Sequence, residues 1–209
     1  MATPARPPHL SMIRGFHLAD FLTLGNAACG TTSVFAAMAY VETRHARALL
    51  TAIVLLPVGL VFDVLDGRVA RWRQRHSAMG RELDSLADVI SFGVAPAALA
   101  YGAGMRGGWD VVVLIYFVCC GVSRLARFNV TAEALSTDTG TVKYFEGTPI
   151  PSSLVLVAIV AGCAWLGRLG DALPLGTVHP GVGTLHPLAL LWFASGSLMI
   201  SKTLRIPKL

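Results

Sequence analysis

Four aspartates lie close together in a part of the chain that is otherwise strongly apolar. Asp63 and Asp66 are three residues apart, and Asp84 and Asp88 are four apart. Residues at these spacings share one face of a helix, so each pair presents two carboxylates in the same direction. An ionised side chain within a membrane span costs roughly 2.5–3.5 kcal/mol on insertion scales, and such residues mark functional sites. Two antiparallel helices joined by the short basic segment between the pairs would bring all four carboxylates together.

Converging carboxylates repel one another and need a positive charge between them. Ligands that are all oxygen favour Mg²⁺ or Mn²⁺ over zinc, and Mg²⁺ commonly shares its coordination shell with substrate phosphates. We therefore expect one such ion or two. Small residues, Gly67 and Ala70 on the face of Asp63 and Gly80 ahead of Asp84, leave room for a ligand, and Arg71 can meet a phosphate. A single aspartate in a span can relay protons or be structural, but four in this framework favour a metal site.

The composition indicates a membrane protein. Of the 209 residues, 54% are hydrophobic and 14% are charged, and the mean hydropathy is +0.63. These values exclude a disordered chain and leave no room for a large soluble domain. The net charge of +5 includes no long Lys/Arg run, so we expect no nucleic-acid partner. We predict an all-α integral membrane protein, with residues 1–209 forming one domain.

A helix needs about 20 apolar residues to cross the hydrocarbon core of a bilayer. Six windows of this kind predict six transmembrane helices, at residues 20–40, 48–72, 80–103, 109–130, 150–168 and 186–203. With both termini inside, all but four of the 17 Lys and Arg residues fall on one side, which marks it as cytoplasmic. The four carboxylates then face the cytoplasm. We expect the protein to lie in the cytoplasmic membrane of a bacterium or an archaeon.

The two ends of this topology carry further expectations. Residues 1–19 form a cytoplasmic segment that is either a helix lying in the membrane interface or an unstructured tail. His179 and His186 lie on the outer side, far from the aspartates, and are expected to be surface histidines.

Written out, residues 63–88 read D-x2-D-G-x2-A-R-x8-G-x3-D-x3-D. This pattern resembles the signature of the CDP-alcohol phosphatidyltransferase family. The resemblance implies a six-helix membrane enzyme, expected as a homodimer, that displaces CMP from a CDP-linked lipid and transfers the phosphatidyl group to an alcohol. It also implies site residues: two metal ions on Asp63, Asp66, Asp84 and Asp88, with Asp88 also the general base, and contacts to the CDP moiety from Gly67, Arg71 and Ser77.

Four further stretches resemble the branch of the family whose acceptor alcohol is L-serine: residues 23–30, 84–97, 123–130 with 145–153, and 198–208. The resemblance implies CDP-diacylglycerol and L-serine as substrates, and phosphatidylserine and CMP as products. Thr23 and Asn26 are expected to contact the nucleotide or its phosphates. The chain has Ala19-Asp20 where family members usually have Pro-Asn.

A zwitterionic acceptor needs a cation for its carboxylate and an acceptor for its ammonium group. Arg124 and Arg127, three apart on one helix face and followed by Asn129, suit the carboxylate, and Glu146 suits the ammonium. Alternatively, the arginines anchor the span at the membrane surface or hold a lipid phosphate.

The sequence leaves three other functional interpretations open. The acceptor could be glycerol 3-phosphate or an inositol phosphate, although such acceptors need a denser cationic pocket. From another class, a cation-coupled transporter could carry its ion on the aspartates, but it does not need the framework of Gly67, Arg71 and Gly80. An inactive scaffold is disfavoured because all four carboxylates are present.

Overall fold

The computed structural model describes residues 18–72, 78–136, 144–201 and 205–207. The predicted segment at residues 1–19 therefore lies almost wholly outside the described residues. Within them the chain is helical, as the composition and hydropathy predict. The long helices are α2 (Leu18–Thr43), α3 (Ala46–Trp72), α4 (Ala78–Asp88), α5 (Ala95–Ala103), α6 (Gly108–Ser136), α7 (Leu154–Trp165) and α8 (Leu190–Ile200).

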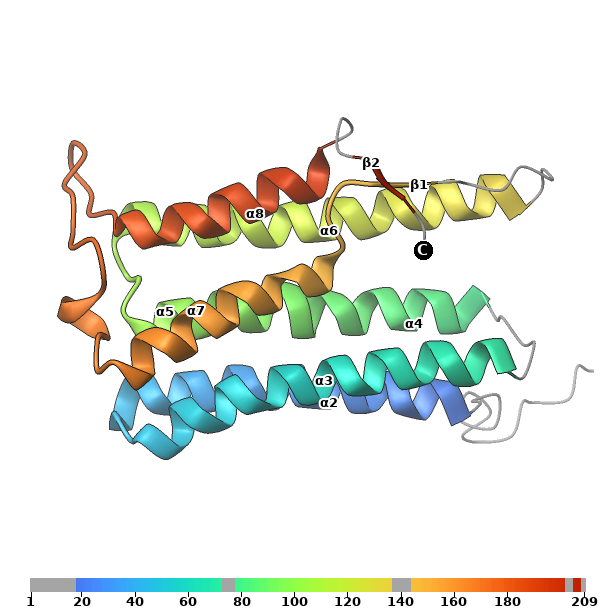
Figure 1. Cartoon of the computed structure of the whole chain (residues 1–209), viewed down its shortest axis with the longest axis horizontal. Helices are drawn as coiled ribbons and strands as arrows, with labels where there is room; N and C mark the ends of the chain where they lie inside the picture. Colours follow the sequence, from blue (N-terminus) through green and yellow to red (C-terminus); the bar gives the residue numbers. More distant parts are fainter. Residues whose placement is uncertain (1–17, 73–77, 137–143, 202–204, 208–209) are drawn as a thin grey trace, which may run out of the picture.

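Shorter elements connect these helices. A π-helical segment, η1 (Val89–Val94), joins α4 to α5 without a break, and three 3₁₀ turns are η2 (Ile150–Ser153), η3 (Gly170–Ala172) and η4 (Pro187–Ala189). Strands β1 (Tyr144–Glu146) and β2 (Arg205–Pro207) pair antiparallel, with Glu146 opposite Arg205. This small ribbon, which the sequence did not predict, ties the segment before α7 to the chain beyond α8 (Figure 1).

Four helical stretches of the described chain are long and apolar enough to cross a membrane: Leu18–Thr43, Ala46–Val69, Met79–Ala103 and Gly108–Thr131. They coincide with the first four predicted spans. The last two predicted spans correspond to shorter apolar helices, Ile150–Trp165 and Pro187–Ile200. An all-α membrane protein is confirmed, whereas the count of six crossings stays a prediction.

The helices form three layers (Figure 1). Helices α2 and α3 pack side by side in one layer, α6 and α8 in another, and the continuous rod of α4, η1 and α5 lies between them together with α7. The buried core is apolar and includes Leu56, Phe92, Leu99, Phe117 and Trp192. The central rod touches helices of both outer layers and therefore links the three layers.

Large apolar side chains also cover the outside of the helices. Phe35, Val61, Ile115 and Val155 are each more than half exposed. A soluble monomer rarely exposes apolar surface on this scale, because such surface is costly in water. The same side chains are in a favourable environment against lipid tails, which agrees with a membrane location.

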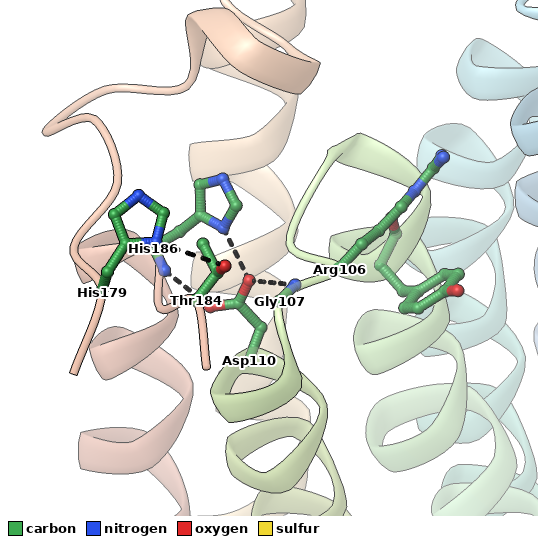
Figure 2. A network of polar contacts seen from close by, with 7 residues as sticks. Arg106, Gly107, Asp110, His179, Thr184 and His186 are labelled. Atoms are coloured by element: carbon green, nitrogen blue, oxygen red, sulfur yellow. Dashed lines mark hydrogen bonds and ion pairs between the residues drawn. The ribbon is translucent and has the colours of Figure 1, made fainter. Parts of the chain in front are cut away.

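A polar clasp closes the end of the bundle that lies away from the aspartates (Figure 2). Asp110, in the first turn of α6, accepts hydrogen bonds from the backbone N–H of His186 at 2.7 Å and from the backbone N–H of Gly107 at 2.8 Å. The His186 ring pairs with the same carboxylate, with Nδ1 and Oδ2 2.6 Å apart. These bonds fix the long loop before α8 to the start of α6.

The clasp corrects one expectation about the outer histidines. His179 is exposed, as predicted, but His186 is buried against Asp110. The prediction of a surface His186 was wrong because its partner lies 76 residues away in the sequence. Nothing in the local pattern around position 186 indicates that partner.

Candidate active site

Three carboxylates converge where the chain passes from α3 to α4. Asp63 and Asp66 lie near the end of α3 and Asp84 lies in α4. One oxygen from each of the three lies within 4.8 Å of the others. Asp66 is buried, while Asp63 and Asp84 are partly buried. The predicted convergence of the two helices is therefore what the structure contains.

This donor set suits a divalent cation. All three donors are carboxylate oxygens, which are the ligands that Mg²⁺ and Mn²⁺ prefer. Within the described part of the chain, Oδ1 of Asp84 is buried and has no hydrogen-bond partner. A buried carboxylate oxygen without a partner carries a large desolvation cost, which a bound cation offsets.

Asp88 stands one helical turn beyond Asp84 and lies outside this group of three. It is buried at the end of α4, and its carboxylate interacts electrostatically with those of Asp63, Asp66 and Asp84. The four aspartates thus form one site, in which three oxygens are poised for a shared ligand and the fourth carboxylate lies beside them.

Helix α2 supplies the hydrogen bonds to these carboxylates. The Thr23 hydroxyl donates to Oδ2 of Asp66 at 2.6 Å, and Nδ2 of Asn26 donates to Oδ1 of Asp88 at 3.3 Å. Asp20, one turn before Thr23, is also buried and interacts electrostatically with Asp66. The two residues predicted to touch the nucleotide therefore lie against the aspartates.

The predicted CDP-binding residues are described only in part. Gly67 follows Asp66 directly, and a Cβ added at Gly67 would meet no other heavy atom within 4 Å. This open space beside the carboxylates is consistent with room for a ligand. Arg71 lies on α3 one turn further on, but its side chain is outside the described residues, as is the whole of Ser77.

Helix α6 brings Arg124 to the carboxylates. Its guanidinium interacts electrostatically with Asp88. Within the described residues, its Nε is buried and has no hydrogen-bond partner. Arg124 thus combines a buried donor that has no partner in the described residues with an electrostatic interaction with Asp88. Arg127 is partly buried one turn further along the same helix.

Asn129 has a different set of contacts from those that the sequence predicted. Its Nδ2 donates to the Ser85 hydroxyl at 3.0 Å and to a Glu82 carboxylate oxygen at 3.3 Å. Its Oδ1 lies 3.2 Å from the same Ser85 hydroxyl. The side chain therefore ties α6 to α4 next to Asp84. Glu146 lies in β1, and its side chain is outside the described residues.

Comparison with known proteins identifies the family. Residues 16–194 match the family described as CDP-alcohol phosphatidyltransferase. The chain belongs to the CDP-alcohol phosphatidyltransferase family. The matched residues include all four aspartates and the α2 residues that bond to them.

Several relatives of this family are similar over long stretches. A Saccharomyces cerevisiae protein named CDP-diacylglycerol–serine O-phosphatidyltransferase is 46% identical over 203 residues, which is 96% of this chain and 74% of the relative. A Helicobacter pylori protein of the same name is 42% identical, over 61% of the chain and 53% of the relative. An archaetidylserine synthase from Methanothermobacter thermautotrophicus is 38% identical, over 68% of the chain and 56% of the relative.

These relatives differ in how much of their length the chain matches, and they bear on the expected host. The yeast protein matches nearly the whole chain, whereas the matched stretches span little more than half of the Helicobacter and Methanothermobacter proteins. Because the relatives come from a yeast, a bacterium and an archaeon, they do not favour the expected bacterial or archaeal host over a eukaryotic one.

Sequence reasoning missed two groups of residues at the site. The first is Asp20 as a buried neighbour of Asp66. Its signal was available, since Asp20, Thr23 and Asn26 recur every three residues on one face of α2. The second is Ser85 as the partner of Asn129, for which the sequence held no signal, because the two positions lie 44 residues apart.

Proposed function

We propose that the protein transfers the phosphatidyl group of CDP-diacylglycerol to the hydroxyl of L-serine, giving phosphatidylserine and CMP. The observation that carries this proposal is the 46% identity to the yeast relative over 96% of the chain, because that relative is named for this reaction. Family membership supports the transfer from a CDP-linked lipid. The convergent carboxylates supply chemistry suited to it.

In this reaction the serine hydroxyl oxygen attacks the phosphorus that carries the diacylglycerol. A new P–O bond forms there, the P–O bond to CMP breaks, and the hydroxyl proton leaves. We assign that proton to Asp88, whose buried carboxylate lies beside the other three aspartates. CMP departs with the electron pair of the broken bond.

Asp63, Asp66 and Asp84 would hold Mg²⁺ or Mn²⁺, with Asp88 completing a site for two ions. Such an ion supplies positive charge that offsets the charge of the pyrophosphate. The support is the set of three carboxylate oxygens within 4.8 Å of one another. The residues themselves orient the CDP-lipid and take up the proton.

The CDP moiety would lie over the end of α3. Gly67 leaves open space there, and Arg71 and Ser77 are assigned to it by resemblance to the family. Thr23 and Asn26, assigned to the CDP-lipid on the same grounds, are already hydrogen-bonded to Asp66 and Asp88. For these two residues a role through the carboxylates is the better-supported one.

The serine carboxylate would bind Arg124, whose Nε has no hydrogen-bond partner within the described residues and which lies close to Asp88. Arg127 and Glu146 remain assigned to the carboxylate and the ammonium group, respectively. Asn129 would act indirectly, because its side chain is engaged with Ser85 and Glu82.

We further propose that residues 1–209 form one membrane domain, that the carboxylate end faces the cytoplasm, and that the protein forms a homodimer. The orientation is supported by the uneven distribution of Lys and Arg residues. The dimer rests on resemblance to the family alone.

The test is release of CMP from CDP-diacylglycerol in detergent micelles with Mn²⁺ and a panel of acceptors. L-Serine should drive release, and L-alanine, which has the same charged groups but no hydroxyl, should not. Asp88→Asn should abolish release while the protein remains folded. If glycerol 3-phosphate or an inositol phosphate drives release and L-serine does not, the proposed acceptor is wrong.

A further inference from the structure

Asn26 is the most deeply buried polar residue that touches an aspartate of the site. Its side chain is 0% exposed, at the centre of the face that α2 turns toward α3 and α4. Its Nδ2 donates to Oδ1 of Asp88. Its Oδ1 lies against Gly59 of α3, where an added Cβ would come within 3.0 Å of it. No surface of this side chain is left for a nucleotide.

The backbone of Asn26 also bonds to the chain beyond Asp88. The Ser91 hydroxyl donates to the backbone oxygen of Asn26 at 2.9 Å. Ser91 lies in η1, three residues beyond Asp88. One residue of α2 therefore holds the chain on both sides of the turn where α4 becomes π-helical, and π-helical turns are frequent at functional sites.

Gly30 makes this close approach feasible. A Cβ at Gly30 would lie 2.7 Å from Cα of Ser91, closer than real Cβ atoms come to other atoms. Only glycine allows η1 to pack this tightly on α2. This contact brings the Ser91 hydroxyl within hydrogen-bonding distance of the Asn26 backbone oxygen.

We infer that Asn26 is a positioning residue for Asp88, an inference that rests on the proposed role of Asp88 as the base. Its amide holds Oδ1 of Asp88 and leaves Oδ2 to face the acceptor hydroxyl. An amide provides a hydrogen bond without adding positive charge, so it orients the carboxylate and does not form an ion pair with it. Arg124, by contrast, provides the positive charge on the side of α6.

The test is a double-mutant cycle between Asn26→Leu and Asp88→Glu, which keeps a carboxylate at position 88 and so leaves a rate to measure. Leucine has a similar volume but no N–H donor. Loss of a hydrogen-bonding partner behind a functional group commonly costs about 10- to 100-fold in activity, and we expect a fall in kcat of that size. In the Asp88→Glu background, whose longer side chain shifts the carboxylate relative to the Asn26 amide, Asn26→Leu should cause little further loss, because residues that act as one unit are not additive.

The affinity for CDP-diacylglycerol separates this role from a nucleotide contact, and it should be unchanged in Asn26→Leu. A nucleotide contact would instead lower the affinity for CDP-diacylglycerol. A purely structural role would lower kcat by the same factor in both backgrounds. Either result would overturn the inference.

Ser33→Ala is the matched control for folding. Ser33 is also buried on α2, and its hydroxyl bonds to the Ala52 backbone oxygen, away from the aspartates. It should lower thermal stability without lowering kcat. If Asn26→Leu does not fold, Asn26→Ser serves the same cycle. The cycle uses whichever acceptor drives CMP release in the wild type, so a wrong acceptor would refute the proposed substrate and leave this inference standing.

Discussion

Thr23→Val should weaken metal binding while leaving the shape of the site intact. The Thr23 hydroxyl donates to Oδ2 of Asp66 at 2.6 Å, and both residues are buried. Valine keeps the volume and the branching of threonine but has no donor. The substitution therefore removes one short hydrogen bond from a carboxylate that we assign to the metal.

The magnitude follows from two independent estimates. A hydrogen bond to a charged group contributes about 1.5–3 kcal/mol. At about 1.4 kcal/mol for each factor of ten, this corresponds to roughly 10- to 100-fold in a dissociation constant. Loss of a hydrogen-bonding partner behind a metal ligand also costs about 10- to 100-fold in affinity. We expect a rise in the Mn²⁺ dissociation constant of that size.

The assay is Mn²⁺ titration of the purified protein in detergent, followed by electron paramagnetic resonance of the free ion. Thr23→Ser, which retains the hydroxyl, is the control and should bind Mn²⁺ nearly as well as the wild type. If Thr23→Val binds Mn²⁺ with unchanged affinity, or if both variants weaken equally, the hydrogen bond does not support the metal site.

Three other substitutions address separate parts of the structure. Gly67→Ala should leave thermal stability unchanged or raise it, because alanine favours a helix by about 1 kcal/mol and meets no neighbouring atom. It should weaken CDP-lipid binding measured by titration calorimetry, and wild-type affinity would contradict a ligand at Gly67. Arg124→Gln should raise the KM for L-serine by about 10- to 100-fold, because a charge-assisted bond is lost, with CDP-lipid affinity unchanged; a change confined to CDP-lipid binding would reassign Arg124 to the lipid phosphate. Asp110→Ala should destabilise the fold by about 3 kcal/mol in chemical denaturation, because it removes the partner of buried His186. His179→Ala, at an exposed histidine, is the control. A loss of kcat at full stability would contradict a structural role for the clasp.

Much of the fold could be predicted from the sequence because the membrane imposes a length and a composition on each span. The first four predicted spans coincide with helices long enough to cross. The π-helical segment Val89–Val94 was not predicted, and its Ser91 bonds to Asn26, which lies 65 residues away in the sequence. The clasp of Asp110 and His186 was missed because its partners lie 76 residues apart in the sequence.

In the candidate site, too, features set by local spacing could be predicted and contacts between distant residues could not. Spacings of three and four residues predicted which aspartates share a face, and Asp63, Asp66 and Asp84 do converge. The partners of these carboxylates on α2 lie 43 and 62 residues away along the chain, and no local pattern reports such contacts. Asn129 illustrates the limit, because its place after two arginines indicated a substrate contact, whereas its side chain bonds to α4.

The reaction itself can be followed with isotopically labelled L-serine. The purified protein is reconstituted in liposomes containing CDP-diacylglycerol and Mn²⁺, and the lipids are extracted and examined by mass spectrometry. We expect the label in phosphatidylserine, in an amount equal to the CMP released, and none when Asp88→Asn replaces the wild type. CMP release without label in any lipid, or labelled lipid formed equally well by Asp88→Asn, would contradict transfer to serine with Asp88 as the base.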